Sequence, residues 1–260
     1  MNATALPITA QLHSWLNAWR WATDRRARHQ PRPYRETPAG ALTGLTLPVS
    51  RRLSQLRSHY GVGFEQQLNA DNALENYVYL DVLHRLRECS AAWPAEQGRV
   101  LDVGCKNFYY AAALAAAFRP AQLMGLELEG HRRYRDGHRR SDYAAFYTGQ
   151  ISGARYCVGD ICDWREKADL VSCWYPFVFA EVAVAWGLPL SAFAPQRFFP
   201  ALANAVAPGG LLLVVNQGLA EWQACARWLG EQRLRCVAKV VVDKPLLPRP
   251  APPVASLWQA

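Results

Sequence analysis

Three acidic residues stand at the ends of short apolar segments in the second half of the chain. Asp102 lies in the segment that starts at Arg99, Glu127 ends a second segment, and Asp160 follows a third. A carboxylate there can accept hydrogen bonds from the hydroxyls of a ribose, or from the exocyclic amine of an adenine. Three such acids suit a ligand that joins a ribose, an adenine and a cationic amino-acid tail.

The turn after the first acid also fits a ligand site. Gly104 lets the backbone pass close to a ligand, and the next helix offers free N–H groups and the positive end of its dipole. Lys106 could pair with a carboxylate of the ligand or point into solvent, and the sequence leaves both open. Ile161, next to Asp160, would cover one face of a ring.

The elements that must position these residues follow from the apolar periodicity. Strands that alternate with helices require a parallel sheet covered on both faces, and ligands bind beyond the carboxyl ends of such strands. The last two strands have no helix between them, so we expect an antiparallel hairpin at the sheet edge. The expected strands are 99–103, 123–127, 154–158, 168–173, 211–215, 236–242 and 254–258, and the expected helices are 108–118, 197–206, 221–230 and one that follows residue 127 and runs through 147.

Residues 1–95 carry helical and loop signals but no convincing strand. A first amphipathic helix is followed by a proline-rich irregular segment, and a second helix runs to about Cys89, with Asn69 or Asp71 as its cap. We therefore expect a helical N-terminal extension over 1–95 and an α/β domain over 96–260. The basic run 131–140 is interpreted as a solvated helix face, with phosphate binding as the alternative.

Composition bounds the class of protein. The chain has 260 residues, of which 51% are hydrophobic and 12% aromatic, as in a folded globular protein. Its net charge of +8 is carried by twenty-five arginines and four lysines, which allows an anionic partner or an arginine-rich surface. Seven cysteines without paired spacing argue against disulfides and a zinc site and fit the cytoplasm. We expect no metal, no signal peptide and no membrane span.

Four motifs, in order, resemble those of the class I S-adenosylmethionine-dependent methyltransferases. They are Val100-Leu-Asp-Val-Gly-Cys105, Gly125-Leu-Glu127, Gly159-Asp160 and Pro208-Gly-Gly-Leu-Leu-Leu-Val-Val215. The resemblance covers about 99–260 and does not reach the first 95 residues. It implies a seven-stranded, mostly parallel Rossmann-like sheet, S-adenosylmethionine as cofactor, and methyl transfer as the reaction.

The resemblance also implies roles for individual residues. Asp102 would hold the methionine amino group through water, Glu127 the ribose hydroxyls and Asp160 the adenine amine. Glu129 and Asp163 are rivals for the last two roles. The predicted cofactor residues are Asp102, Gly104, Cys105, Lys106, Glu127, Asp160 and Ile161.

One departure from the family pattern concerns the glycine loop. The family reads G-x-G-x-G, whereas Lys106 and Phe108 replace the second and third glycines here. We therefore expect the loop to run differently, or the cofactor to lie further out. The same departure keeps open a non-catalytic binding or scaffold protein. A nicotinamide-dependent dehydrogenase would need G-x-G-x-x-G, of which the chain has only Gly104.

An aromatic segment after the fourth strand is the predicted acceptor pocket, formed by Trp174, Tyr175, Pro176 and Phe177. Amine-methylating relatives often carry N-P-P-Y there, and Trp174 in place of the asparagine argues against that mechanism. Tyr175 is the candidate for contact with the acceptor, and no general base is predicted. We expect a hydrophobic or lipid-linked small molecule as acceptor, with RNA second. The acceptor atom and the oligomeric state stay open.

Overall fold

Seven strands form one mixed sheet in the computed structural model, which describes residues 7–259. The strands are β1 (Arg99–Val103), β2 (Gln122–Glu127), β3 (Ala154–Val158), β4 (Ala168–Trp174), β5 (Val206–Asn216), β6 (Arg235–Val241) and β7 (Val254–Gln259). Their order is β3-β2-β1-β4-β5-β7-β6. The first five strands run parallel, and β7 pairs antiparallel with both β5 and β6. The predicted sheet and its terminal hairpin are confirmed.

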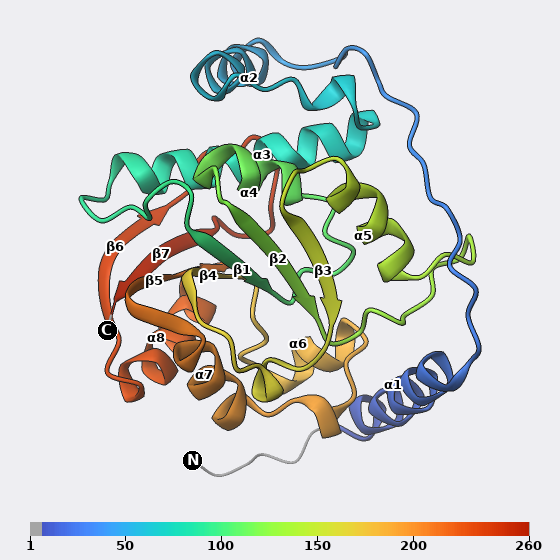
Figure 1. The fold of residues 1–260 in the computed structure, drawn as a ribbon. Coiled ribbons are helices and arrows are strands. Elements are labelled where there is room, and N and C mark those ends of the chain that lie inside the picture. Colours follow the sequence, from blue (N-terminus) through green and yellow to red (C-terminus); the bar gives the residue numbers. More distant parts are fainter. Residues whose placement is uncertain (1–6, 260) are drawn as a thin grey trace.

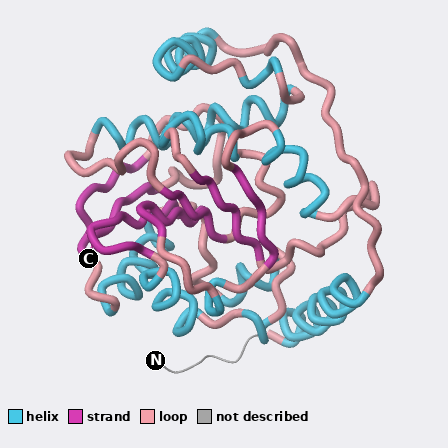
Figure 2. The backbone as a smooth tube through the Cα atoms, viewed as in Figure 1, coloured by secondary structure: helices cyan, strands magenta, loops and turns pink. Residues whose placement is uncertain are grey.

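Helices cover both faces of the sheet (Figure 1). Helices α3, α4 and α5 lie over one face, and α7 and α8 lie over the other, so two hydrophobic cores form, one on each side (Figure 2). No helix in the described range 7–259 is both long and apolar enough to cross a membrane. The helices are α1 (Ile8–Arg26), α2 (Leu47–Tyr60), α3 (Ala70–Glu88), α4 (Ala111–Phe118), α5 (Arg140–Gly149), α6 (Ala180–Ala185), α7 (Pro195–Asn204) and α8 (Leu219–Glu231), with short 3-10 turns η1 (Phe64–Gln66), η2 (Ile161–Asp163) and η3 (Leu190–Ala192).

Helix α3 belongs to the layer that covers the sheet, although it precedes the first strand. Asn69 caps it as expected, because its side chain accepts a hydrogen bond of 2.9 Å from the backbone of Asn72. The Asn76 amide then ties α3 to the start of α4: it donates to the Tyr109 carbonyl at 2.8 Å and accepts from the Ala113 N–H at 3.0 Å. The domain division at residue 95 stays a prediction.

The segment 27–46 connects α1 to α2 and passes outside α5 (Figures 1 and 2). Polar contacts hold it there: His29 lies 2.9 Å from Asp142, and the Glu36 carboxylate accepts hydrogen bonds from the Asn69 backbone and the Tyr147 hydroxyl. As a result, α2 lies beside α3, whereas α1 lies at the opposite end of the molecule (Figure 1).

We predicted a helix directly after β2, and this prediction is wrong for the first half of that helix, because α5 begins only at Arg140. Residues 128–139 form a loop instead, with an isolated antiparallel bridge between Arg133 and Arg139. Gly137 adopts a positive φ of 85°, which ends any helix, and the Asp142 carboxylate accepts from the Arg139 N–H at 2.8 Å at the new helix start. The basic run is therefore not a helix face.

Candidate ligand site at the strand ends

The carboxyl ends of three parallel strands are joined by backbone hydrogen bonds. The Gly104 N–H donates to the Leu126 carbonyl at 2.8 Å, and the Gly159 N–H donates to the Glu127 carbonyl at 3.0 Å. These bonds bring the tips of β1, β2 and β3 to one edge of the sheet. The strand order reverses between β1 and β4, which is where open parallel sheets bind ligands.

The loop after β1 keeps a left-handed backbone at all three positions where the family pattern has glycine. Gly104, Lys106 and Phe108 have φ values of 75°, 53° and 59°. Each non-glycine residue in this region costs about 1–3 kcal/mol. The backbone therefore takes, at all three positions, a conformation that glycine adopts without strain, and two of these positions carry large side chains.

The ring of Phe108 packs where a neighbouring residue has no side chain. Phe108 is fully buried, and a Cβ atom on Gly125 would lie 2.8 Å from its ring carbons and 2.9 Å from the Cys105 sulfur. Because Gly125 of β2 has no Cβ atom, the Phe108 ring can pack closer to the backbone of β2 than a larger residue at position 125 would allow. Cys105 is itself fully buried beneath the loop.

Asp102 lies entirely inside the protein. One carboxylate oxygen accepts a hydrogen bond of 2.6 Å from the Tyr110 hydroxyl, and the other accepts one of 2.5 Å from the Ser172 hydroxyl. Burial raises the pKa of Asp102 to about 7, although both hydroxyl bonds oppose the shift. In this conformation Asp102 links β1, β4 and the start of α4, and it is shielded from solvent.

The Glu127 carboxylate receives three hydrogen bonds from the chain itself. One oxygen accepts from the Lys106 N–H at 2.7 Å, and the other accepts from the Glu129 N–H and from the Arg140 guanidinium, each at 2.8 Å. A carboxylate offers about four acceptor positions, so one remains. Glu127 is 5% exposed.

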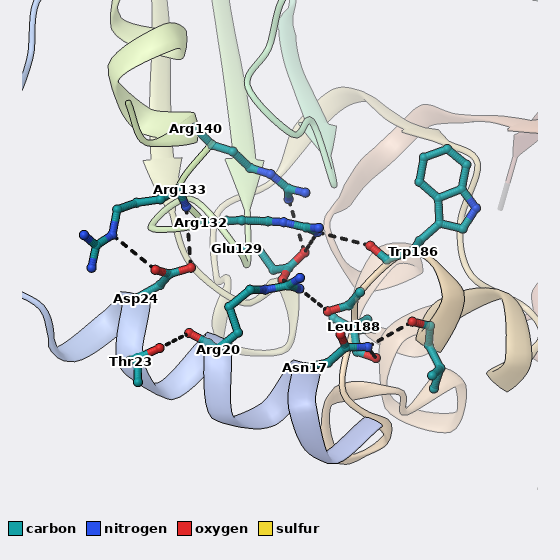
Figure 3. A network of polar contacts seen from close by, with 12 residues as sticks. Asn17, Arg20, Thr23, Asp24, Glu129, Arg132, Arg133, Arg140, Trp186 and Leu188 are labelled. Atoms are coloured by element: carbon teal, nitrogen blue, oxygen red, sulfur yellow. Dashed lines mark hydrogen bonds and ion pairs between the residues drawn. The ribbon is translucent and has the colours of Figure 1, made fainter. Parts of the chain in front are cut away.

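Its rival Glu129 belongs to a cluster of arginines (Figure 3). Its carboxylate lies 3.2 Å from Arg132, 3.4 Å from Arg140 and 3.9 Å from Arg20, which comes from α1. Burial raises the pKa of Glu129, while Arg140 and Arg132 oppose the shift. Two adjacent buried carboxylates thus share one buried arginine, Arg140.

Asp160 caps the short turn η2, because its side chain accepts from the Cys162 N–H at 2.9 Å. Its rival Asp163 is exposed. Ile161 is 4% exposed and borders a hollow of about 260 Å³ between η2 and α7, together with Trp164 and Arg197. Asp160 therefore sits at the strand edge as expected, while Ile161 faces away toward α7.

Lys106 packs against an aromatic ring from α6's C-terminal end. Its ammonium lies 4.8 Å from the ring centre of Trp186, and its carbonyl accepts a hydrogen bond of 2.7 Å from the Tyr156 hydroxyl. Burial lowers the pKa of Lys106. The side chain therefore does not point into bulk solvent, and its contact with a ligand carboxylate stays a prediction.

The predicted acceptor segment is largely packed into the protein. Trp174 is 6% exposed, with its ring 4.3 Å from Tyr79 of α3 and 6.0 Å from Tyr110. Tyr175 adopts a φ of 57°, and burial raises its pKa to about 12, so its hydroxyl keeps its proton at neutral pH. Pro176 is buried as well, and Phe177 is partly exposed.

The sequence analysis gave four residues of this region no role in the cofactor site: Tyr110, Arg140, Ser172 and Trp186. Ser172 left a signal, because it is a polar residue in an apolar strand and stands opposite Asp102 in the parallel register. Arg140 was hidden within a basic run. Tyr110 and Trp186 look like ordinary core aromatics in the sequence, and only the fold brings them to the strand ends.

Comparison with known proteins supports the assignment of the fold. No model of a protein family and no curated protein matches the sequence. A Haloferax volcanii protein assigned as a methyltransferase, described in complex with the Trm112 methyltransferase activator, shares 15% identity at a TM-score of 0.52, over 79% of this chain and 97% of its own. An Aquifex aeolicus SAM-dependent methyltransferase shares 13% identity at a TM-score of 0.50, over 69% of this chain and 88% of its own. The chain has the Rossmann-like fold of these proteins.

Proposed function

We propose that this chain, which has the fold of class I methyltransferases, binds S-adenosylmethionine and transfers its methyl group. One observation carries the proposal: the left-handed loop at Gly104, Lys106 and Phe108 contacts the Glu127 carboxylate at the end of β2, and Asp160 follows the end of the neighbouring strand β3. A turn of this shape and two acids on neighbouring strands match the parts of an adenosyl ligand.

The residues fit such a ligand once one contact changes. A ribose diol donates two hydrogen bonds, and Glu127 has one acceptor position left. Arg140 can release Glu127 and keep Glu129, which lies 3.4 Å away. The backbone N–H groups of Lys106 and Glu129 would continue to orient the Glu127 carboxylate. We infer that Arg140 loses its contact with Glu127 and keeps the one with Glu129 when the cofactor binds.

The other predicted residues divide into contact and positioning roles. Asp160 would bind the adenine amine, and the backbone at Gly104 and Cys105 would line the methionine portion. Asp102 acts as a positioning residue, because it is fully buried and bonded to Tyr110 and Ser172. The cofactor supplies a methyl group on a sulfonium, and the protein's contribution is to align the acceptor with it.

A hydrophobic or lipid-linked small molecule remains our proposed acceptor, and RNA is the second candidate. The aromatic surroundings of Trp174 and Tyr175 support the first. The net charge of +8 supports the second. We place the activity in the cytoplasm, where the seven unpaired cysteines would stay reduced.

Calorimetry with S-adenosylmethionine and S-adenosylhomocysteine tests the proposal. We expect the wild type to bind both and Glu127→Gln to bind at least tenfold more weakly, a loss of about 1.4 kcal/mol. The exposed carboxylate Glu231 provides a matched control, and Glu231→Gln should bind as the wild type does. Radiolabelled methyl donor added to a cell extract then shows whether label enters the lipid or the RNA fraction.

A non-catalytic binding protein is the alternative, and a specific contact favours it: Arg140 already satisfies the acid that would hold the ribose. Absence of binding of either compound to the folded wild type would overturn the proposed activity and support this alternative. If the wild type binds the cofactor but transfers no methyl group to any component of an extract, the proposed cofactor site stands and the proposed methyltransferase activity is wrong.

A further inference from the structure

Helix α1 turns its polar side toward the protein. The Asn17 side-chain amide donates to the Val184 carbonyl at 2.9 Å and to the Leu188 carbonyl at 3.4 Å, and Arg20 donates to the Gly187 carbonyl at 2.7 Å (Figure 3). The helix is thus attached through hydrogen bonds to the backbone of the last turn of α6 and of the residues that follow it. This is the reverse of an ordinary surface helix, which buries its apolar side.

Asp24 completes this inward side. It is 8% exposed, and its carboxylate lies 3.3 Å from the Arg133 guanidinium (Figure 3). It is also the sole acidic residue between Ile8 and Arg28. The outward side of the helix therefore carries no carboxylate.

The outward side carries an apolar stripe, which we name the α1 stripe. Four of its residues follow the spacing of a single helix face, with intervals of four, three and four. Their side chains are well exposed, and another leucine lies beside them. The α1 stripe consists of Ile8 (84% exposed), Leu12 (58%), Trp15 (64%), Leu16 (45%) and Trp19 (62%).

Basic residues follow the stripe at the C-terminal end of the helix. Arg25 and Arg26 lie in its last turn, and Arg28 comes just beyond; all three are exposed. Aliphatic residues and tryptophans on one face, with arginines and no acid beside them, make the pattern of a helix that lies in the interface of an anionic bilayer. Tryptophan is enriched at that depth because its ring is apolar and its N–H is polar.

We propose that α1 docks the protein onto an anionic lipid membrane, lying in the membrane plane with the α1 stripe among the acyl chains. Pairing with a second copy fits less well. A helix–helix seam is built from leucine and β-branched residues, whereas this stripe has tryptophans in two successive turns, at Trp15 and Trp19. The positive charge of the chain adds attraction to an anionic surface and none to a second copy.

The docking does not depend on methyl transfer. If the proposed activity also holds, docking would bring α6 and the half-exposed Trp186, which covers Lys106, toward the lipid surface. A lipid-linked acceptor would then approach the strand ends from the membrane side.

Co-sedimentation of the full chain with vesicles tests the proposal. One set contains phosphatidylcholine alone, and the other contains phosphatidylcholine with phosphatidylglycerol. We expect binding to the second set, with a blue shift of the tryptophan fluorescence, and at least tenfold weaker binding by the double variant Trp15→Ser/Trp19→Ser. Leu47→Ser is the matched control, because Leu47 is 63% exposed on α2, and it should bind like the wild type.

Charge is tested separately. Arg25→Gln and Arg26→Gln should each weaken binding to the anionic vesicles about fivefold, which corresponds to about 1 kcal/mol per arginine, and added salt should have the same effect. Circular dichroism confirms that the variants fold.

Three results would overturn the docking proposal. They are no binding of the wild type to anionic vesicles, equal binding by Trp15→Ser/Trp19→Ser, and a dimer in sedimentation that this double variant dissociates. The last result would assign the stripe to a second copy. Calorimetry with the cofactor tests the methyltransferase proposal separately. The docking proposal and the methyltransferase proposal can therefore each fail without the other.

Discussion

The Arg140 guanidinium lies 2.8 Å from the Glu127 carboxylate, and both side chains are more than nine-tenths buried. A pair of charges in such a place contributes little when intact, yet it is costly to break from one side. The pair therefore serves to fix the position of Glu127 at the end of β2.

Removing one partner should reveal this asymmetry. Arg140→Met leaves Glu127 and Glu129 without their shared cation, and we expect a loss of about 3–5 kcal/mol in the free energy of unfolding. The double variant Glu127→Gln/Arg140→Met should recover part of it. Urea denaturation measures both. An equal loss in the single and double variants would contradict the role of the pair, and Glu96→Gln, which breaks an exposed pair with Arg119, should cost less than about 1 kcal/mol.

Asp102 should make stability fall as pH rises. Its pKa is about 7 in the folded protein against 3.8 in the unfolded chain, so the folded state binds the proton more tightly between these values. The free energy of unfolding should thus decrease from about pH 4 to pH 7, by about 4 kcal/mol at most. Asp102→Asn should flatten this decrease, whereas the exposed Asp243→Asn should retain it. Parallel pH profiles of wild type and Asp102→Asn, measured by urea denaturation, would argue against the raised pKa.

Backbone strain at Lys106 can be isolated by comparing two truncations. Lys106→Gly and Lys106→Ala both lose the contact with Trp186, but only glycine accepts a φ of 53° without cost. We expect the glycine variant to be more stable by about 1 kcal/mol. Lys239 is a matched control, because its ammonium also lies over a ring, that of Trp222 at 4.1 Å, but it belongs to the extended strand β6. At this position we expect Lys239→Ala to be more stable than Lys239→Gly in thermal denaturation.

The contact between Gly125 and Phe108 predicts a steric cost. Gly125→Ala places a methyl group 2.8 Å from the ring, so we expect a loss of about 1–3 kcal/mol in stability. The same change should cost less when Phe108 is already leucine. Gly149→Ala in α5 meets no atom within 4 Å and should be neutral or stabilising. Additive losses in Gly125→Ala/Phe108→Leu would show that the two residues do not compete for space.

The sheet could be predicted because its determinants are local. Short apolar runs separated by glycines and amphipathic helices specify a parallel sheet, and the lack of a helix before Val254 specifies the hairpin. Asp102, Glu127 and Asp160 were placed at strand ends by the same pattern. Their partners could not be predicted, since Ser172 reaches Asp102 across seventy residues of chain.

The basic run between β2 and α5 shows why composition misleads. Polar residues at high density indicate a solvated helix when nothing else is known. Here Asp24 of α1 pairs with Arg133, Glu129 pairs with Arg132 and Arg140, and residues 128–139 form a loop that allows these contacts. Asp24 lies 109 residues before Arg133 in the chain, so no local pattern records that contact.

Helix α1 is synthesised long before the residues to which it bonds. Its hydrogen bonds reach Val184, Leu188 and Leu190, which are 167 to 176 residues further along. At a translation rate of about 5–20 residues per second, the nascent helix waits roughly 8–35 s on the ribosome for these partners. Throughout that time Trp15 and Trp19 stay available to whatever surface lies near the exit tunnel, so the protein could meet its lipid before its last strand has been synthesised.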